Sequence, residues 1–202
     1  MLEAIVLNVV FECAVLQSST ELLVEYRISN QSDQTIGIFN RLPVIAIDGA
    51  RSYPPDAVYV DFKDGALLLQ KLVLPIPDGL SMAMREAPDV TRLLPNEKIQ
   101  ERFGIALPAK AQNPLRRAAM VGAARGAEVA ADDPKTAHQV VVSVGFFPSE
   151  PTYRFTSISN DLHDTYRVWP PGPSVDHQQI LSKTIVLKEP IRVLDYRVTS
   201  SP

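Results

Sequence analysis

The feature that most constrains the fold of this chain is an alternation of apolar and polar residues with a period of two. Successive side chains of a β-strand point to opposite faces of a sheet, so the alternation is typical of a strand with one buried and one solvent-exposed face. In ELLVEYRIS, residues 21–29, four apolar residues alternate with polar ones: Leu22, Val24, Tyr26 and Ile28. KIQERFGIAL, residues 98–107, follows the same pattern, with Glu101 as the one charged residue on its apolar side. Both stretches are predicted to be strands.

Further runs rich in β-branched and aromatic residues extend this prediction to most of the chain. Between residues 57–62 and 66–74, the pair Asp64-Gly65 predicts a tight hairpin, because the turn requires positive φ angles that Asp-Gly readily adopts. About ten strands are expected in all. They cover residues 3–16, 21–29, 35–39, 43–48, 57–62, 66–74, 98–107, 137–147, 180–188 and 191–198.

Proline usage supports an all-β fold. The 202 residues include 17 prolines and 9 glycines, and proline is tolerated at turns and strand ends but not inside helices or central strands. We therefore expect a single antiparallel β-sandwich domain spanning residues 1–202, immunoglobulin-like or related. A chain with one cysteine lacks the disulfide of true immunoglobulin domains.

The charge balance argues against a polyanionic partner. The chain has 20 basic and 23 acidic side chains and a net charge of −3, so nucleic acid is not expected as a ligand. The apolar N-terminal stretch carries Glu3 and Glu12 and no basic leader, which predicts neither a signal peptide nor a membrane span. We expect a cytoplasmic protein in which the single Cys13 is buried and unreactive.

Residues 108–134 form the first of two long predicted connections, and loops of this length are usually functional or disordered. Asn113 and Pro114 are suited to begin a helix, while Gly122 and Gly126 weaken the alanine-rich run that follows. A partly helical or flexible insertion between strands is expected. Its apolar and basic residues are candidates for contact with an acidic partner protein. They are Leu115, Arg116, Arg117, Met120, Val121 and Arg125.

Residues 160–179 form the second long connection, a proline-rich loop. Four of its residues are of types that bind zinc: His163, Asp164, Asp176 and His177. Neighbours on an extended chain point in opposite directions, however, and no H-x-H or H-E-x-x-H pattern organises these four. The stretch RVWPPGP fits the R-x-x-P-x-x-P pattern of polyproline ligands and contains the only tryptophan, so it is a candidate for a protein contact. Its candidate residues are Arg167, Trp169, Pro170 and Pro173. The favoured interpretation is that its prolines stiffen a crossover between strands while Trp169 covers an edge of the core.

No catalytic signature accompanies these candidates, because the chain has neither a G-x-S-x-G motif nor a glycine-rich phosphate loop. The leading hypothesis is a non-enzymatic protein-binding module, which acts as an adaptor, inhibitor or assembly component and needs no cofactor. One alternative is a carbohydrate or small-ligand binder with four stacking rings: Tyr153, Phe155, Tyr166 and Trp169. The other is a metal-assisted hydrolase built on residues 160–179.

Overall fold

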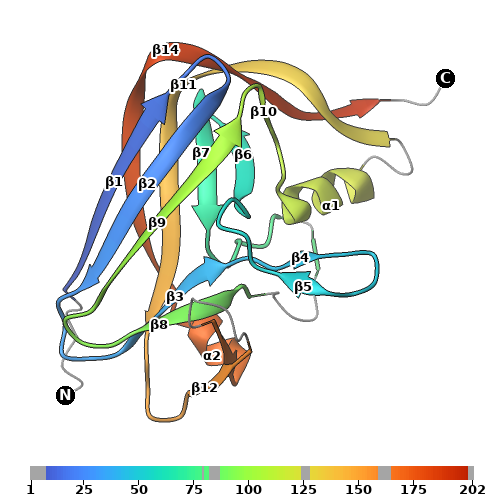
Figure 1. Ribbon diagram of the computed structural model, residues 1–202. Helices are drawn as coiled ribbons and strands as arrows, with labels where there is room; N and C mark the ends of the chain where they lie inside the picture. The colour runs from blue at the N-terminus through green and yellow to red at the C-terminus, as the bar shows by residue number, and fades with distance from the viewer. Residues whose placement is uncertain (1–7, 79, 82–86, 124–127, 159–164, 200–202) are drawn as a thin grey trace.

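The strands are arranged in two facing sheets and a small hairpin. The computed structural model describes residues 8–78, 80–81, 87–123, 128–158 and 165–199 (Figure 1). Within these residues the chain is all-β, as the alternation predicts, and it contains two short helices. No helix in this part of the chain is long and apolar enough to span a membrane.

Sheet A is the smaller sheet. It contains β1 (Val9–Gln17), β2 (Glu21–Asn30) and β9 (Lys98–Ala106) in the order β1-β2-β9, and all its pairs are antiparallel. The strands predicted at 21–29 and 98–107 are therefore confirmed. The strand predicted at 3–16 is confirmed from Val9 onward, while residues 1–7 lie outside the described part of the chain.

Sheet B is the larger sheet and is built around β11. Its main path is β10-β14-β11-β3-β8-β13-β12, and the hairpin β6-β7 joins it through parallel pairing of β7 with β11. Its strands are β3 (Ile36–Arg41), β6 (Tyr59–Lys63), β7 (Ala66–Lys71), β8 (Asp89–Leu93), β10 (Ala109–Lys110), β11 (Glu128–Pro148), β12 (Arg154–Ser157), β13 (Tyr166–Trp169) and β14 (Gln179–Thr199). The separate hairpin of β4 (Val44–Ile45) and β5 (Arg51–Ser52) projects away from both sheets in Figure 1. The helices are α1 (Pro114–Ala123) and α2 (Pro171–Asp176).

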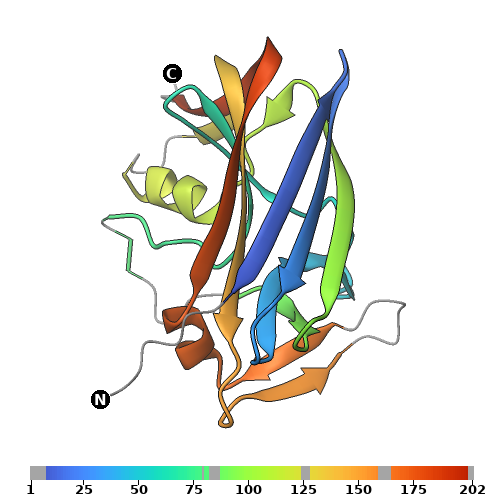
Figure 2. The same ribbon diagram turned by 90° about the vertical axis from the view of Figure 1, so that its left-hand side faces the viewer.

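The main hydrophobic core lies between the sheets. Figure 2 shows β1, β2 and β9 as one layer and β11 with β14 as the facing layer. The alternating apolar residues of β2 point into this space, where Leu22, Val24 and Ile28 are fully buried. They pack with the inner face of sheet B, which includes Leu67, Leu69, Val140, Val142 and Val144. A second apolar cluster surrounds Phe39 and Phe147 and includes Val175 of α2.

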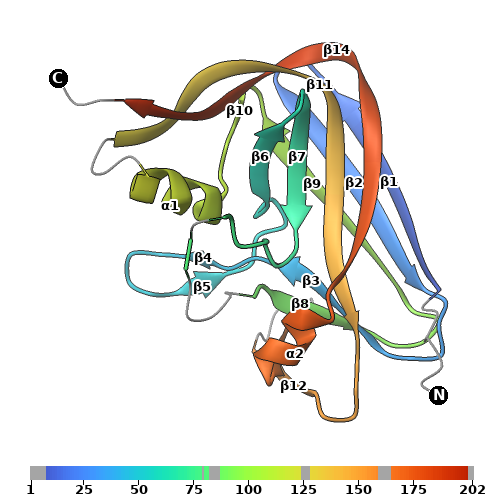
Figure 3. The same cartoon turned by 180° about the vertical axis from the view of Figure 1, so that it is seen from behind.

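β11 and β14 form a long ribbon that the alternation does not predict. Each strand is 21 residues long, and the two pair antiparallel almost from end to end. Residues 128–134 are therefore strand, so the prediction that all of 108–134 is an insertion is wrong. The strands predicted at 180–188 and 191–198 are one strand with an irregularity around Pro190, which has no N–H to donate. The start of β11 and the end of β14 pair with each other, and this end of the ribbon curves over α1 (Figure 3).

The connection between β9 and β11 is a crossover between sheets and not an insertion into a hairpin. β9 belongs to sheet A and β11 to sheet B, so these two strands do not pair with each other. The connection contains β10, which pairs in parallel with Val193 and Leu194 of β14, and α1. The expected helical part is thus confirmed. A short turn cannot replace this segment, because the segment carries the chain from one sheet to the other.

The sequence predicts the tight turn at Asp64-Gly65 better than it predicts the short strands. Asp64 and Gly65, between β6 and β7, have φ angles of 50° and 75°, which confirms the predicted hairpin. The alternation does not predict β8, β12 and β13. Two of these short strands contain charged residues that pair with each other, Asp89 of β8 and Arg167 of β13. In a sequence, charged residues of this kind are expected to be solvent-exposed, and they interrupt the apolar pattern by which a strand is predicted.

Gly37 in β3 generates a stability prediction. It lies opposite Phe147 of β11, and a Cβ atom on Gly37 would lie 2.3 Å from Phe147 Cζ. We expect Gly37→Ala to lower the free energy of unfolding by about 1–3 kcal/mol, as overpacking does. Gly122→Ala is the matched control, because no atom lies within 4 Å of its added methyl group, and in a helix the change should raise stability by up to about 1 kcal/mol. Urea denaturation measures both. Equal stability of Gly37→Ala and wild type would contradict the packing described here.

Candidate functional site

Glu101, the charged residue on the apolar side of β9, is the centre of a buried ion cluster. Its carboxylate lies 2.9 Å from Arg41 Nη1 of β3 and 3.0 Å from Lys71 Nζ of β7. Asn40 donates a hydrogen bond to the same carboxylate at 2.9 Å, and the Tyr26 hydroxyl of β2 donates another. All five side chains belong to residues that are at most 8% exposed. The cluster therefore joins sheet A to sheet B inside the core.

An irregularity in β3 allows two consecutive residues to reach Glu101. The pairing of β3 with β8 shifts register between Ile38 and Arg41, and an extra residue in one strand locally breaks the alternation of side chains. Asn40 and Arg41 therefore both contact the carboxylate. Thr91 of β8 holds them in place: its N–H donates to Asn40 Oδ1 at 3.1 Å, and its hydroxyl accepts from Arg41 Nε at 3.2 Å.

The members of this cluster shift one another's pKa. Burial opposes ionisation of Glu101, but the charges of Lys71 and Arg41 outweigh that effect and hold the pKa of Glu101 below its ordinary value of 4.5. Burial lowers the pKa of Lys71 against the attraction of Glu101. Burial, reinforced by the Glu101 charge, raises the pKa of Tyr26 well above 10.0. At neutral pH Glu101 is thus an anion and Tyr26 an uncharged donor.

The ion cluster is closed to ligands. Lys71 is 2% exposed, and its Nζ also donates to the carbonyl of Pro55 at 2.8 Å. Within the described residues, every buried side-chain nitrogen and oxygen has a hydrogen-bond partner. A lysine and a glutamate side by side are a combination used in acid–base catalysis, but a substrate has no access to this pair. We therefore assign the cluster a structural role.

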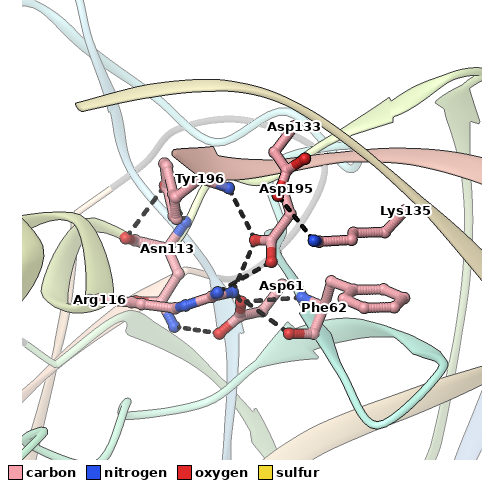
Figure 4. Close-up of polar contacts among 8 residues, drawn as sticks. All are labelled: Asp61, Phe62, Asn113, Arg116, Asp133, Lys135, Asp195 and Tyr196. Atoms are coloured by element: carbon pink, nitrogen blue, oxygen red, sulfur yellow. Dashed lines mark hydrogen bonds and ion pairs between the residues drawn. The ribbon is translucent and has the colours of Figure 1, made fainter. Parts of the chain in front are cut away.

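Arg116 of α1, a predicted contact for an acidic partner, forms ion pairs within the molecule. Its guanidinium lies between Asp61 of β6 and Asp195 of β14, with Nη1 2.8 Å from Asp195 Oδ1 and an ion pair to Asp61 (Figure 4). Asn113 accepts a hydrogen bond from the Arg116 N–H at 3.0 Å, which confirms its role as the helix cap. The Asn113 amide also donates to Asp61 at 2.9 Å. These contacts dock α1 on sheet B.

The other candidate residues of α1 have different environments. Met120 packs against a small core cluster, and Leu115 is half-buried. Arg117 is exposed, and Val121 is 44% exposed. Arg125 lies outside the described residues. Among the described candidates of this helix, Arg117 and Val121 are therefore the ones open to solvent.

The 160–179 segment contains a strand and a helix rather than a polyproline ligand. β13 ends at Trp169, and Pro173 lies within α2. An α-helical proline is incompatible with a polyproline II run through RVWPPGP, so that interpretation of the motif is wrong. Pro170 is half-buried between the two elements. Trp169 is 65% exposed, which keeps it available for a contact of another kind.

The described part of this segment gives no support to a metal site. His177 Nδ1 lies 3.1 Å from the Tyr153 hydroxyl and 3.2 Å from a carboxylate oxygen of Glu150. His163 and Asp164 lie outside the described residues. Among the residues that are described, no three histidine, cysteine, aspartate or glutamate side chains group closely enough to hold a metal ion.

Three of the four aromatic residues considered for ligand stacking pack against the protein itself. Phe155 stacks on Phe147 with ring centroids 6.3 Å apart, and Tyr166 meets the edge of Phe155 at 6.1 Å. Tyr153 is 7% exposed. Trp169 is the one member of the four with a largely open ring.

Cys13 is half-buried rather than fully buried. It packs against the main core from β1. Burial raises the pKa of the thiol to about 11, with a smaller opposing effect of Lys183. At neutral pH the thiol therefore stays protonated, and a protonated thiol is a poor nucleophile.

An exposed apolar surface forms where the β4–β5 hairpin approaches β13. Four large apolar side chains make up this hairpin–tryptophan surface: Val44, 47% exposed, Ile45, 55%, Ile47, fully exposed, and Trp169, 65%. Two hollows of about 290 Å³ and about 270 Å³ adjoin there, and Pro43, Ala87 and Pro88 line both. Exposed apolar residues around a hollow are characteristic of binding surfaces.

The sequence predicts only part of this surface. Trp169 is among the predicted contact residues, whereas residues 43–48 are predicted as an ordinary strand. That prediction is wrong for most of the stretch, because β4 contains only Val44 and Ile45 and pairs with β5 alone. Apolar residues in sequence indicate the side chains that are able to form a core, but they do not indicate which of them another element covers.

Comparison with protein-family models, with characterised proteins and with solved structures found no match to this chain.

The docking of α1 generates a second stability prediction. Arg116→Met leaves Asp61 and Asp195 without their shared cation, and we expect the free energy of unfolding to fall by about 2 kcal/mol, below the value for a fully buried pair, because the Arg116 side chain is 30% exposed. Arg117→Met on the same helix should change stability by less than about 0.5 kcal/mol. Urea denaturation and amide hydrogen exchange of α1 measure the effect. Equal free energies of unfolding and equal hydrogen exchange of α1 in the two variants would show that Arg116 does not anchor the helix.

Proposed function

We propose that the protein is a non-enzymatic protein-binding module whose contact surface is the hairpin–tryptophan surface. The observation that supports this proposal is the exposure of Val44, Ile45 and Trp169, which line two adjoining hollows, together with the exposure of Ile47 at the tip of the hairpin. Covering apolar surface contributes about 25 cal/mol per Å² to association before the costs of ordering are subtracted. Tryptophan is also among the residues that most often dominate the energy of an interface.

The hairpin holds its apolar tip in a defined position. Ala46 N–H donates to the Ala50 carbonyl at 2.9 Å, and Gly49 N–H donates to the Ala46 carbonyl at 2.9 Å. The Asp48 carboxylate accepts from the Ala50 N–H, also at 2.9 Å. Gly49 has a φ angle of 83°, which favours glycine at this position. An ordered tip that presents Ile47 loses little entropy on binding, and this preorganisation favours recognition of a partner.

The alternatives receive less support from the same residues. A carbohydrate site needs several open rings, whereas Tyr153, Phe155 and Tyr166 pack inside the molecule. The described part of the 160–179 segment contributes no grouped metal ligands. The proposal includes a cytoplasmic location, which suits a chain whose one cysteine, Cys13, forms no disulfide. An immunoglobulin-like relationship stays a prediction.

Substitution at the hairpin tip tests the proposed function. Ile47→Asp places a charge at the tip of the β4–β5 hairpin without disturbing the core, because Ile47 is fully exposed. Val186→Asp is the matched control, since Val186 is 77% exposed on β14, outside the surface. We expect affinity capture from the native cell to recover a partner protein with wild type and with Val186→Asp, and to recover at least about tenfold less with Ile47→Asp, a loss of about 1.4 kcal/mol.

Circular dichroism and thermal unfolding of the three proteins ensure that the variants are folded. Identical sets of captured proteins for wild type and Ile47→Asp would refute the assignment of the hairpin–tryptophan surface as the contact surface.

A further inference from the structure

The hollow beside Trp169 combines an apolar floor with a charged rim. Phe39 and Val168 are buried at 1% and 7% exposure and line it, together with Pro43 and Pro171. Trp169 stands at the edge with most of its side chain exposed. The hollow has a volume of about 270 Å³, which is large enough for one or two amino-acid side chains but small for a whole drug-sized ligand.

The charged groups of this hollow leave a surplus of positive charge. Among the described residues its lining contains Arg51, Arg167 and Asp89, two cations and one anion, so these residues carry a net charge of +1. Asp89 is 7% exposed and fully engaged: it accepts from the Tyr53 hydroxyl at 2.8 Å and from Arg167 Nε and Nη2 at 3.2 and 3.3 Å. The Arg167 side chain remains 50% exposed. Asp89 therefore orients the Arg167 guanidinium and leaves part of it open to solvent.

The adjoining hollow extends the binding space toward the β4–β5 hairpin. It is lined by Val44, Ile45 and Tyr59 and shares Pro43 and Ala87 with the hollow beside Trp169. An anionic side chain at Arg51 and Arg167 can therefore be followed by an apolar side chain near the hairpin. An extended peptide supplies such a sequence of groups.

We propose that the two adjoining hollows bind an extended acidic segment of the partner protein, in which an aspartate or glutamate pairs with Arg51 and Arg167 and neighbouring apolar side chains contact Trp169 and the β4–β5 hairpin. The inference rests on the proposed function and specifies the chemistry of the partner. Asp89 occupies the Nε–Nη2 edge of Arg167, so the guanidinium of Arg51 and Nη1 of Arg167 are the groups that would donate to the carboxylate of the peptide. The indole face of Trp169 offers a rigid apolar contact. Because the paired charges are partly exposed, the affinity decreases as ionic strength rises.

The test is selection from a random peptide library displayed on phage, with the full-length protein as bait. The expected peptides carry an aspartate or glutamate next to apolar residues. A synthetic peptide with the selected sequence should lose at least about tenfold in affinity on Arg51→Glu and on Trp169→Ala, measured by fluorescence polarisation. Arg102→Glu is the charge-matched control, because Arg102 is exposed on β9, outside both hollows, and it should leave the affinity unchanged.

Three results would overturn the inference. The first is enrichment of peptides without acidic residues, and the second is an affinity that Arg51→Glu does not change. The third is a failure to select any peptide, with the protein instead sedimenting with anionic phosphatidylserine vesicles in a manner that Trp169→Ala abolishes. If the inference fails while Ile47→Asp still abolishes partner capture, the proposed function stands and only the acidic chemistry is wrong. If partner capture is also unaffected by Ile47→Asp, both fail.

Discussion

The arrangement of the two sheets depends on the contact of one buried carboxylate with two cations. Glu101 of sheet A lies between Arg41 and Lys71 of sheet B. Removing one member of a buried ion pair leaves an uncompensated charge in the core, which is strongly destabilising, so each of these side chains requires the others. Apolar side chains pack acceptably in more than one relative position of two sheets, whereas a hydrogen-bonded network of this kind is satisfied in only one. The apolar core supplies the driving force, and the ion cluster selects the arrangement.

The same cluster positions the proposed peptide site. Arg41 lies opposite Asp89 in the pairing of β3 with β8, and Asp89 orients Arg167 at the edge of the hollow. Phe39, two residues before Arg41 in β3, lies in the lining of that hollow. The irregularity in β3 turns Arg41 toward Glu101 and so links the core to the binding surface. A shift of one sheet relative to the other would move the end of β3 and with it the residues that face the partner.

Local patterns in the sequence predict local structure, and the remainder depends on pairing between distant residues. The alternation identifies β2 and β9, and the isolated charge on the apolar side of β9 already marks Glu101 as unusual. Lys71, the single charge within the apolar run 66–74, carries the same signal. The pairing of β11 with both β14 and β7 has no such local signal. It brings together β6 and β14, whose Asp61 and Asp195 bind Arg116, a residue that the sequence predicts as a contact for an acidic partner. The strand predicted at 43–48 is reduced to Val44 and Ile45, and both residues are exposed. Hydrophobicity alone does not indicate whether another element covers a strand.

The measurement that tests this account most directly is the free energy of urea unfolding of wild type, Glu101→Gln and the exposed control Glu25→Gln, from about pH 7 to about pH 3. The pKa of Glu101 is lower in the folded protein than its ordinary value of 4.5, so its contribution is present above that pH and is lost as the pH falls through the folded value. At neutral pH we predict that Glu101→Gln is less stable than wild type by about 3 kcal/mol or fails to fold, with the difference shrinking as wild-type Glu101 becomes protonated. Equal stability of wild type and Glu101→Gln at neutral pH would contradict the claim that this carboxylate holds the two sheets together.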